Sequence, residues 1–89
     1  MSELIVYEGF IRTRSSLWSK RIGQNVDNML RTIEQMPGVG SSLLPQSIQD
    51  EFGPNVLKAV VSPYEIIYEY DQEEDVIYVY DLLYGPNVR

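Results

Sequence analysis

Three carboxylates in the C-terminal half, Glu65, Glu69 and Asp81, have the chemistry of general acids and bases or of ligands for a hard cation. Glu65 and Glu69 share one face of a run with strand-like alternation, and at about 3.3 Å per residue their positions are roughly 13 Å apart. This separation is too large for two carboxylates that act on one substrate. We therefore expect a solvated acidic face here and not a catalytic pair.

The residue types that usually hold a metal ion are missing from the chain. It contains neither cysteine nor histidine, which excludes a typical zinc site. The acidic run from 71 to 75 lacks the glycine and the spacing of a calcium-binding EF-hand loop, so it is predicted to be a turn. We expect no metal and no cofactor.

Tyrosines are dense in the C-terminal half and allow two interpretations. Aromatic rings can stack on RNA bases, but such platforms normally carry cations, whereas the neighbours here are glutamates and aspartates. Tyrosine is also favoured in sheets and at protein interfaces. The second interpretation, core and interface, is favoured. The tyrosines concerned are Tyr64, Tyr68, Tyr70, Tyr78, Tyr80 and Tyr84.

Charge is distributed unevenly along the chain, whose net charge is −6. Residues 37–89 carry nine acids against only Lys58 and Arg89, whereas residues 1–36 are close to neutral. A nucleic-acid footprint needs clustered cations that displace counterions from phosphates, so direct nucleic-acid binding is not expected. Lys58 is either a contact to a phosphate or a partner, or a solvated lysine whose stem covers a strand face.

The remaining cations form a basic patch near the N-terminus. Its members are Arg12, Arg14, Lys20 and Arg21, and the segment contains no acid. If the segment is helical, these side chains form an exposed face that could meet an acidic partner or DNA. The alternative is an ordinary solvated helix face with the only tryptophan, Trp18, anchoring the core.

An apolar stripe predicts helices ahead of the sheet. Its members recur at helical spacing and are Ile22, Val26, Met29, Ile33 and Met36. Gly23 interrupts the pattern and Asn25 is a possible N-cap, so two helices are expected, at about 12–22 and 25–36. A shorter helix is predicted within residues 44–53.

Short β-rich runs predict the strands. Residues 4–7 should form an opening strand, and 56–61 should begin a meander. Residues 64–70 alternate between apolar and polar, which predicts a half-buried strand. Residues 76–83 are apolar on both faces apart from Asp81, which predicts a more central strand.

The elements together predict one α+β domain over residues 1–89. It should comprise an N-terminal strand, a helical hairpin and a three- to four-stranded antiparallel sheet. No apolar run approaches about 20 residues and the N-terminus lacks the pattern of a signal peptide, so a cytoplasmic location is expected.

Four short segments follow one another between residues 36 and 85. They are Met36-Pro37-Gly38-Val39-Gly40-Ser41, Phe52-Gly53-Pro54-Asn55-Val56-Leu57-Lys58, Pro63-Tyr64-Glu65-Ile66-Ile67-Tyr68 and Leu83-Tyr84-Gly85. In order and spacing they resemble the RelE/ParE family of bacterial toxins. In that family a helical hairpin ends at a P-x-x-G turn, and a meander carries a Y-R-I-I-Y strand and a closing L-H-G-R-R segment.

The chain departs from the RelE branch of that family, which cleaves mRNA on the ribosome with a base, a proton donor and cations. Glu65 stands where the family strand has arginine, and Tyr84-Gly85-Pro86-Asn87 replaces the H-G-R-R segment. Lys58 remains at a position where the family often has a basic residue. The resemblance therefore favours the ParE branch, whose members bind DNA gyrase and need no catalytic residue.

The resemblance implies a toxin of a type II toxin–antitoxin pair, with a cognate antitoxin as partner and DNA gyrase as the candidate target. Two alternatives stay open. One is a ribosome-dependent mRNA endonuclease built on Lys58, Tyr64, Tyr84 and Arg89, and the other is a non-toxic interaction module of the same fold. The residues expected to contact a partner are Lys58, Glu65, Tyr68, Glu69, Tyr80 and Asp81.

Overall fold

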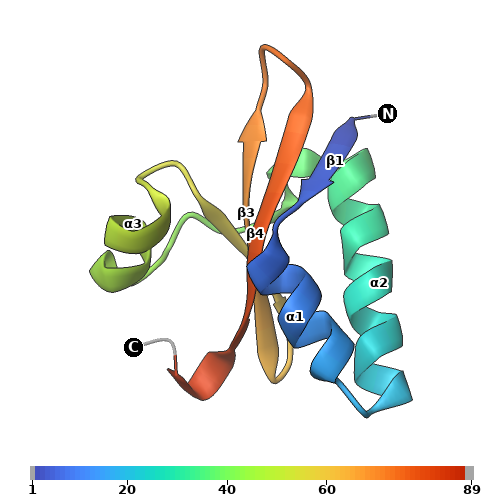
Figure 1. Ribbon diagram of the computed structural model, residues 1–89. Coiled ribbons are helices and arrows are strands. Elements are labelled where there is room, and N and C mark those ends of the chain that lie inside the picture. The colour runs from blue at the N-terminus through green and yellow to red at the C-terminus, as the bar shows by residue number, and fades with distance from the viewer. Residues whose placement is uncertain (1, 88–89) are drawn as a thin grey trace.

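The computed structural model describes residues 2–87 and folds them into a four-stranded sheet with helices on both faces (Figure 1). The strands are β1 (Glu3–Val6), β2 (Leu57–Val61), β3 (Tyr64–Asp71) and β4 (Val76–Tyr84). The helices are α1 (Glu8–Ser16), α2 (Lys20–Gln35) and α3 (Gln46–Phe52), with 3-10 turns η1 (Pro37–Val39) and η2 (Gly85–Asn87). The predicted α+β class is confirmed. None of the helices within residues 2–87 has the length and apolar character needed to cross a membrane.

The strand order is β1-β4-β3-β2, and the last three strands form the predicted antiparallel meander. β1 is different, because it runs parallel to β4, with Glu3 opposite Val76 and Val6 opposite Val79. The sheet is therefore mixed: three strands are antiparallel as predicted, and the N-terminal strand β1 adds a fourth, parallel strand. A parallel neighbour requires a long crossover, which the helices between β1 and the meander supply.

A β-bulge in β4 changes which side chains share a face. Ile67 of β3 pairs with Asp81, but the next residue, Tyr68, pairs with Val79, so Tyr80 has no residue opposite it. A bulge bends the longer strand and lets two successive side chains turn toward the same face. A simple two-residue alternation along β4 therefore fails at Tyr80.

The helical hairpin begins and ends at other residues than those predicted. α1 already starts at Glu8, and α2 starts after Ser19, whose hydroxyl accepts a hydrogen bond from the backbone N–H of Ile22. α2 then continues through Gly23 without a break. The expected helix start at Asn25 is wrong, because Ser19 supplies the N-cap more than a turn earlier.

α1 and α2 cover one face of the sheet, α1 with Phe10 and α2 with the predicted apolar stripe. Val26 and Ile33 are fully buried, and Ile22 and Met29 pack at the border of the same core. The sheet contributes the buried side chains Ala59, Val61, Ile66, Tyr68, Ile77, Val79 and Leu82. Met36 lies beyond the helix end and is 57% exposed, so it does not belong to the buried stripe.

α3 covers part of the opposite face and lies within the predicted segment. Ile48 packs there against Val56 and Ile67. The chain leaves α3 through Gly53, whose φ of 108° is a conformation that favours glycine. β3 therefore has buried residues on both faces from Glu65 to Tyr68, and the expectation of a half-buried strand is wrong because helices cover both faces there.

Candidate functional site

The sheet face on the α3 side carries a row of aromatic rings, which we call the aromatic strip. Its members are Tyr7, which follows β1, Phe52 at the end of α3, and Tyr78 and Tyr80 in β4. Tyr7 meets Tyr80 edge-on, with ring centroids 4.9 Å apart, and meets Tyr78 edge-on at 6.4 Å. Tyr78 and Tyr80 lie nearly parallel at 6.3 Å, and Phe52 lies at 6.0 Å from Tyr80. The strip thus joins β1, β4 and α3.

Glu69 borders the aromatic strip on the β3 side. It is the cross-strand neighbour of Tyr78, and its Oε1 accepts a hydrogen bond of 3.2 Å from the Tyr80 hydroxyl. Burial and the nearby Glu69 charge raise the pKa of Tyr80 to about 12. The Tyr80 phenol therefore remains protonated at physiological pH. Two of the predicted partner-binding residues, Glu69 and Tyr80, lie side by side on this face.

Lys58 and Glu65 form an ion pair on the same side of the sheet. Lys58 Nζ lies 3.4 Å from Glu65 Oε1, and the two side chains are 25% and 11% exposed. A carboxylate tolerates this degree of burial when it is paired. The expectation that Glu65 belongs to a solvated acidic face is therefore wrong, because β2 lies alongside it and supplies the cation. The Lys58 ammonium is therefore already paired with a carboxylate of its own chain.

Asp81 faces α1 and not the aromatic strip. A Cβ on Gly9 of α1 would lie 3.3 Å from the Asp81 carboxyl group, and Oδ1 of Asp81 accepts a hydrogen bond of 2.8 Å from the backbone N–H of Leu82. Asp81 lines a groove of about 640 Å³ between α1 and α3, together with Arg12 and Glu51. The three predicted carboxylates are thus in three different environments.

Tyr68 lies on the helix side of the sheet and is fully buried. Its hydroxyl donates a hydrogen bond of 2.7 Å to the backbone carbonyl of Pro37 and accepts one of 2.8 Å from the backbone N–H of Gly40. Burial raises the pKa of Tyr68. The prediction that Tyr68 contacts a partner is wrong, because the side chain instead attaches the loop after α2 to the core.

Of the four residues considered for RNA cleavage, the three that the structure describes are not brought together. Tyr64 and Tyr84 pack edge-to-face, with centroids 5.5 Å apart, near the exposed Trp18. Lys58 lies on the other side of the sheet, opposite Ile67 in the register. Arg89 lies outside the described residues. Lys58, Tyr64 and Tyr84 therefore do not form the base, proton donor and cation set that RNA cleavage requires.

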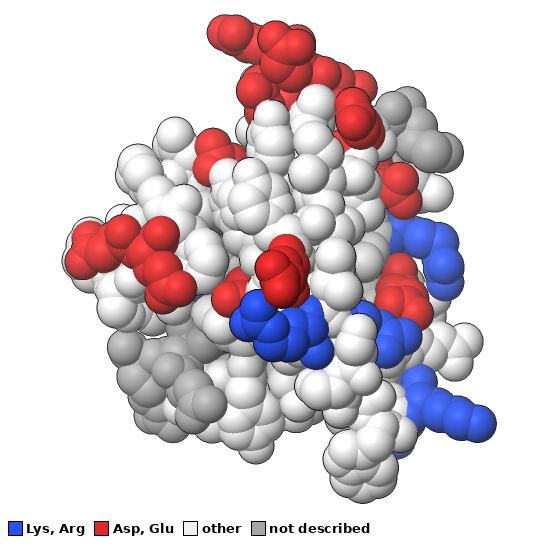
Figure 2. Space-filling model, viewed as in Figure 1, with Lys and Arg blue, Asp and Glu red and all other residues white. Residues whose placement is uncertain are grey.

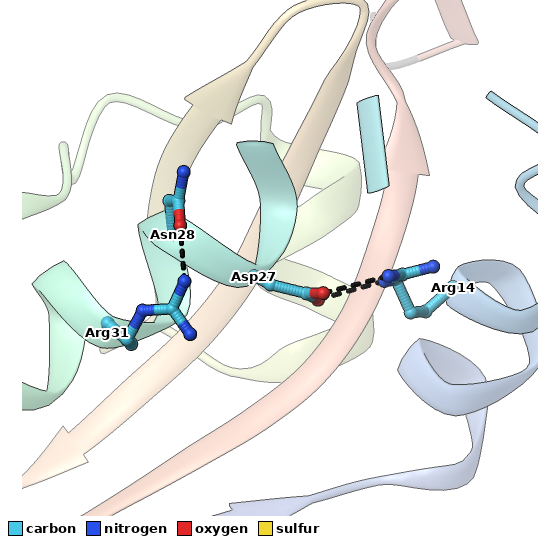
Figure 3. Close-up of polar contacts among 4 residues, drawn as sticks. All are labelled: Arg14, Asp27, Asn28 and Arg31. Atoms are coloured by element: carbon cyan, nitrogen blue, oxygen red, sulfur yellow. Dashed lines mark hydrogen bonds and ion pairs between the residues drawn. The ribbon is translucent and has the colours of Figure 1, made fainter. Parts of the chain in front are cut away.

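Arg14, a member of the predicted basic patch, pairs with an acidic residue of the same chain. Arg14 donates two hydrogen bonds to Asp27 of α2, of 2.9 Å from Nε and 2.8 Å from Nη2 (Figure 3). These hydrogen bonds raise the pKa of Arg14 and lower that of Asp27. A Cβ on Gly23 would lie 3.0 Å from the guanidinium, so the glycine gives Arg14 room against α2. Farther along α2, Arg31 donates a hydrogen bond to Asn28 (Figure 3).

The other members of the patch remain on the surface. Arg12 forms an exposed ion pair of 3.2 Å with Glu8, and Lys20 and Arg21 are exposed. Figure 2 shows these cations spread over α1 and α2, whereas acidic side chains gather over α3 and at the tip of the β3–β4 hairpin. Trp18 is 93% exposed, so the alternative in which it anchors the core is wrong.

The sequence reasoning missed Tyr7 and Phe52 as members of the aromatic strip. Tyr7 reaches the strip only because β1 pairs with β4, and Phe52 reaches it only because α3 folds back onto the sheet. Both contacts join segments that are distant in sequence. The only local signal for Tyr7 was its place as the aromatic residue at the end of the β-rich run 4–7.

Comparisons with known proteins define the fold. No protein-family model matches the sequence, and no curated protein is significantly similar to it. Several solved structures of bacterial toxins match nearly the whole chain. The isolated RelE toxin of E. coli is 15% identical, with a TM-score of 0.73 over 96% of this chain and 85% of that one.

The toxin–antitoxin complex RelBE2 of Mycobacterium tuberculosis gives a TM-score of 0.73 at 16% identity, covering 93% of this chain and 96% of that one. The YoeB/ParE toxin of Agrobacterium tumefaciens gives a TM-score of 0.70 at 9% identity, covering 92% of this chain and 96% of that one. Identities this low establish the fold alone. The chain has the fold of the RelE/ParE toxins.

Proposed function

We propose that the chain is the toxin of a type II toxin–antitoxin pair and that it acts in the cytoplasm by binding a protein, as ParE-type gyrase inhibitors do. The observation that carries the proposal is the match of nearly the whole chain to toxins of both the RelE and the YoeB/ParE kind. A fold can host several functions, so the choice between modes of action rests on the side chains.

The side chains support binding over RNA cleavage. Lys58, the one cation carried by the sheet, is paired with Glu65, and the other cations within residues 2–87 belong to α1 and α2. A phosphate that gains charge in a transition state needs cations aimed at it. The aromatic strip offers instead the rings that are enriched at protein interfaces.

The proposed partner is a cognate antitoxin. The matching Mycobacterium tuberculosis structure is a toxin–antitoxin complex, which supports this assignment by shared fold. The product of a gene adjacent to the one encoding this chain is the candidate to test.

RNA cleavage remains the second candidate, because one of the matching structures is a RelE toxin. A test with purified protein separates the two. We expect inhibition of DNA gyrase supercoiling and no cleavage of translated mRNA in a primer-extension assay. Cleavage at codon positions that Lys58→Ala abolishes would contradict the proposed mode of action.

A further inference from the structure

The aromatic strip presents partly exposed ring surface on the α3 side of the sheet, beside the part that α3 covers. Tyr7 is 44% exposed, and the rings of Tyr78 and Tyr80 are half-buried beside it. Tyr7 stands nearly perpendicular to both, with interplanar angles of 78° and 77°. The face of an aromatic ring carries negative charge density and attracts a cation placed over it. Rings in two orientations therefore border one small area of surface.

Glu69 places a carboxylate at the edge of this area. One of its oxygens accepts the hydrogen bond from Tyr80, and within residues 2–87 Glu69 takes part in no ion pair. An ionised carboxylate has about four acceptor positions, so most of its capacity is open to a ligand. The Tyr80 phenol is neutral at physiological pH and donates its hydrogen bond to Glu69, so it adds no competing charge.

No basic side chain within residues 2–87 is placed to pair with the Glu69 carboxylate. Lys58 is paired with Glu65, and the other five cations within residues 2–87 lie on α1 and α2. The surroundings are also acidic, since the nearby turn between β3 and β4 carries Glu73 and Glu74. Figure 2 shows the resulting group of acidic side chains at the tip of this hairpin. Such a surface repels phosphates and attracts cationic side chains.

We infer that the surface formed by Tyr7, Glu69, Tyr78 and Tyr80 binds an arginine side chain from a basic segment of a partner protein. A guanidinium fits both features at once, because it stacks flat on an aromatic ring while its fork of N–H groups donates to a carboxylate. A lysine ammonium is a compact point charge that can neither stack flat on a ring nor form a bidentate pair with a carboxylate. The identification of the partner as an antitoxin rests on the proposed function, whereas the recognition of arginine does not.

The geometry also explains which acidic residues are unsuited to this role. Glu65 is already neutralised by Lys58, and Asp81 faces α1 and accepts a hydrogen bond from the backbone of Leu82. Glu69 alone among these three combines an open carboxylate with adjacent rings. Specific binding should therefore respond to Glu69 and not to the total negative charge.

The test is a titration of the ¹⁵N-labelled full chain with a blocked tetra-arginine peptide, followed by NMR. We expect the largest saturable shifts at residues 69, 78 and 80, with tetralysine at least threefold weaker. Glu69→Gln, which retains an acceptor for Tyr80, and Tyr7→Leu, at an exposed position, should each weaken tetra-arginine binding at least fivefold. The matched control Glu74→Gln removes the same charge from the exposed turn and should change the Kd less than twofold.

Equal weakening by Glu69→Gln and Glu74→Gln would overturn the inference, because it would indicate non-specific charge attraction. Equal affinity for tetralysine, or shifts centred on residues 71–75, would overturn it as well. These results would leave the proposed function intact, because the peptide reports on the surface whether or not the protein is toxic. Conversely, arginine binding by a protein without effect on growth would contradict only the proposed function.

Discussion

Gly38 and Gly40 stand two residues apart in the loop after α2, and only Gly40 is packed against other atoms. A Cβ on Gly40 would lie 2.6 Å from the Tyr68 hydroxyl and 2.8 Å from the backbone carbonyl oxygen of Lys58, whereas a Cβ on Gly38 would meet nothing within 4 Å. Gly40→Ala should therefore lower the free energy of unfolding by about 1–3 kcal/mol, as overpacking does. Urea denaturation measures the change.

Gly38→Ala is the control for this prediction. It should be neutral or stabilising by up to about 1 kcal/mol, because it restricts the unfolded chain without a clash. If the two substitutions have the same effect, the Tyr68 hydroxyl does not lie against Gly40 as described.

Tyr80 makes stability depend on pH in the alkaline range. Its pKa is about 12 in the folded protein, against an ordinary value of 10.0. A group with a raised folded pKa stabilises the protein fully below the unfolded pKa, and this contribution is lost as the pH rises from about 10 toward 12. The free energy of unfolding should therefore fall over this window, and Tyr80→Phe should make the fall shallower.

Glu69→Gln separates the two causes of the Tyr80 shift. Because burial is the larger cause and the Glu69 charge the second, the substitution should lower the Tyr80 pKa but leave it above its ordinary value. Tyrosine ring signals followed by NMR against pH give the measurement. An unchanged titration in Glu69→Gln would contradict the contact between these two side chains.

At the level of elements, the start of α2 depends on one hydroxyl. The side chain of Ser19 accepts a hydrogen bond from the backbone N–H of Ile22, so Ser19→Ala should cost about 1 kcal/mol of unfolding free energy. Asn25 lies inside the helix and is exposed, so Asn25→Ala should be neutral or stabilising by up to about 0.7 kcal/mol. Thermal unfolding of both variants checks this. If Asn25→Ala lowers the free energy of unfolding more than Ser19→Ala does, the N-cap of this helix is Asn25, as expected from the sequence, and not Ser19.

The docking of α2 on the sheet depends on its buried stripe. Ile33 is fully buried, and Ile33→Ala should lower the free energy of unfolding by about 2–5 kcal/mol. Ile11 on α1 is 51% exposed, and Ile11→Ala should change the free energy of unfolding by less than about 0.5 kcal/mol. Denaturant titrations of the two variants give the comparison, and a loss below about 0.5 kcal/mol for Ile33→Ala would show that this helix face is not the buried one.

Regular elements were predictable because their signal is local and periodic. The stripe containing Val26 and Ile33 identifies α2, and the β-rich runs identify all four strands. The helix boundary at Ser19 was missed because Gly23 looked like a break, although its lack of a side chain accommodates Arg14 from another helix. The bulge at Tyr80 could not be foreseen, since it depends on how β3 and β4 pair and not on either strand alone.

The candidate site was less predictable than the fold because its contacts join distant segments. Glu69 and Tyr80 were each predicted to contact a partner, but the hydrogen bond between them was not predicted. Glu65 was expected in solvent because its pairing with Lys58 requires the β2–β3 register. Tyr68 was selected as a surface residue because alternation places it on a face without indicating which face the helices cover. Tyr7 enters the aromatic strip only through the parallel pairing of β1.

For the molecule as a whole, charge and fold lead to one functional account. The sheet side carries the aromatic strip and the acidic groups, the helices carry most of the cations, and the whole has the fold of the RelE/ParE toxins. Because Lys58, the one cation on the sheet, is paired with Glu65, the charge distribution supports the proposed binding mode of action over RNA cleavage.

The most direct test of this account is the growth rate of bacteria after induced expression of the chain, with and without the product of the adjacent gene. The account predicts that expression alone arrests growth and that coexpression of the adjacent gene restores it. Unimpaired growth on expression alone, or an arrest that coexpression does not relieve, would contradict the assignment of this chain as the toxin of such a pair.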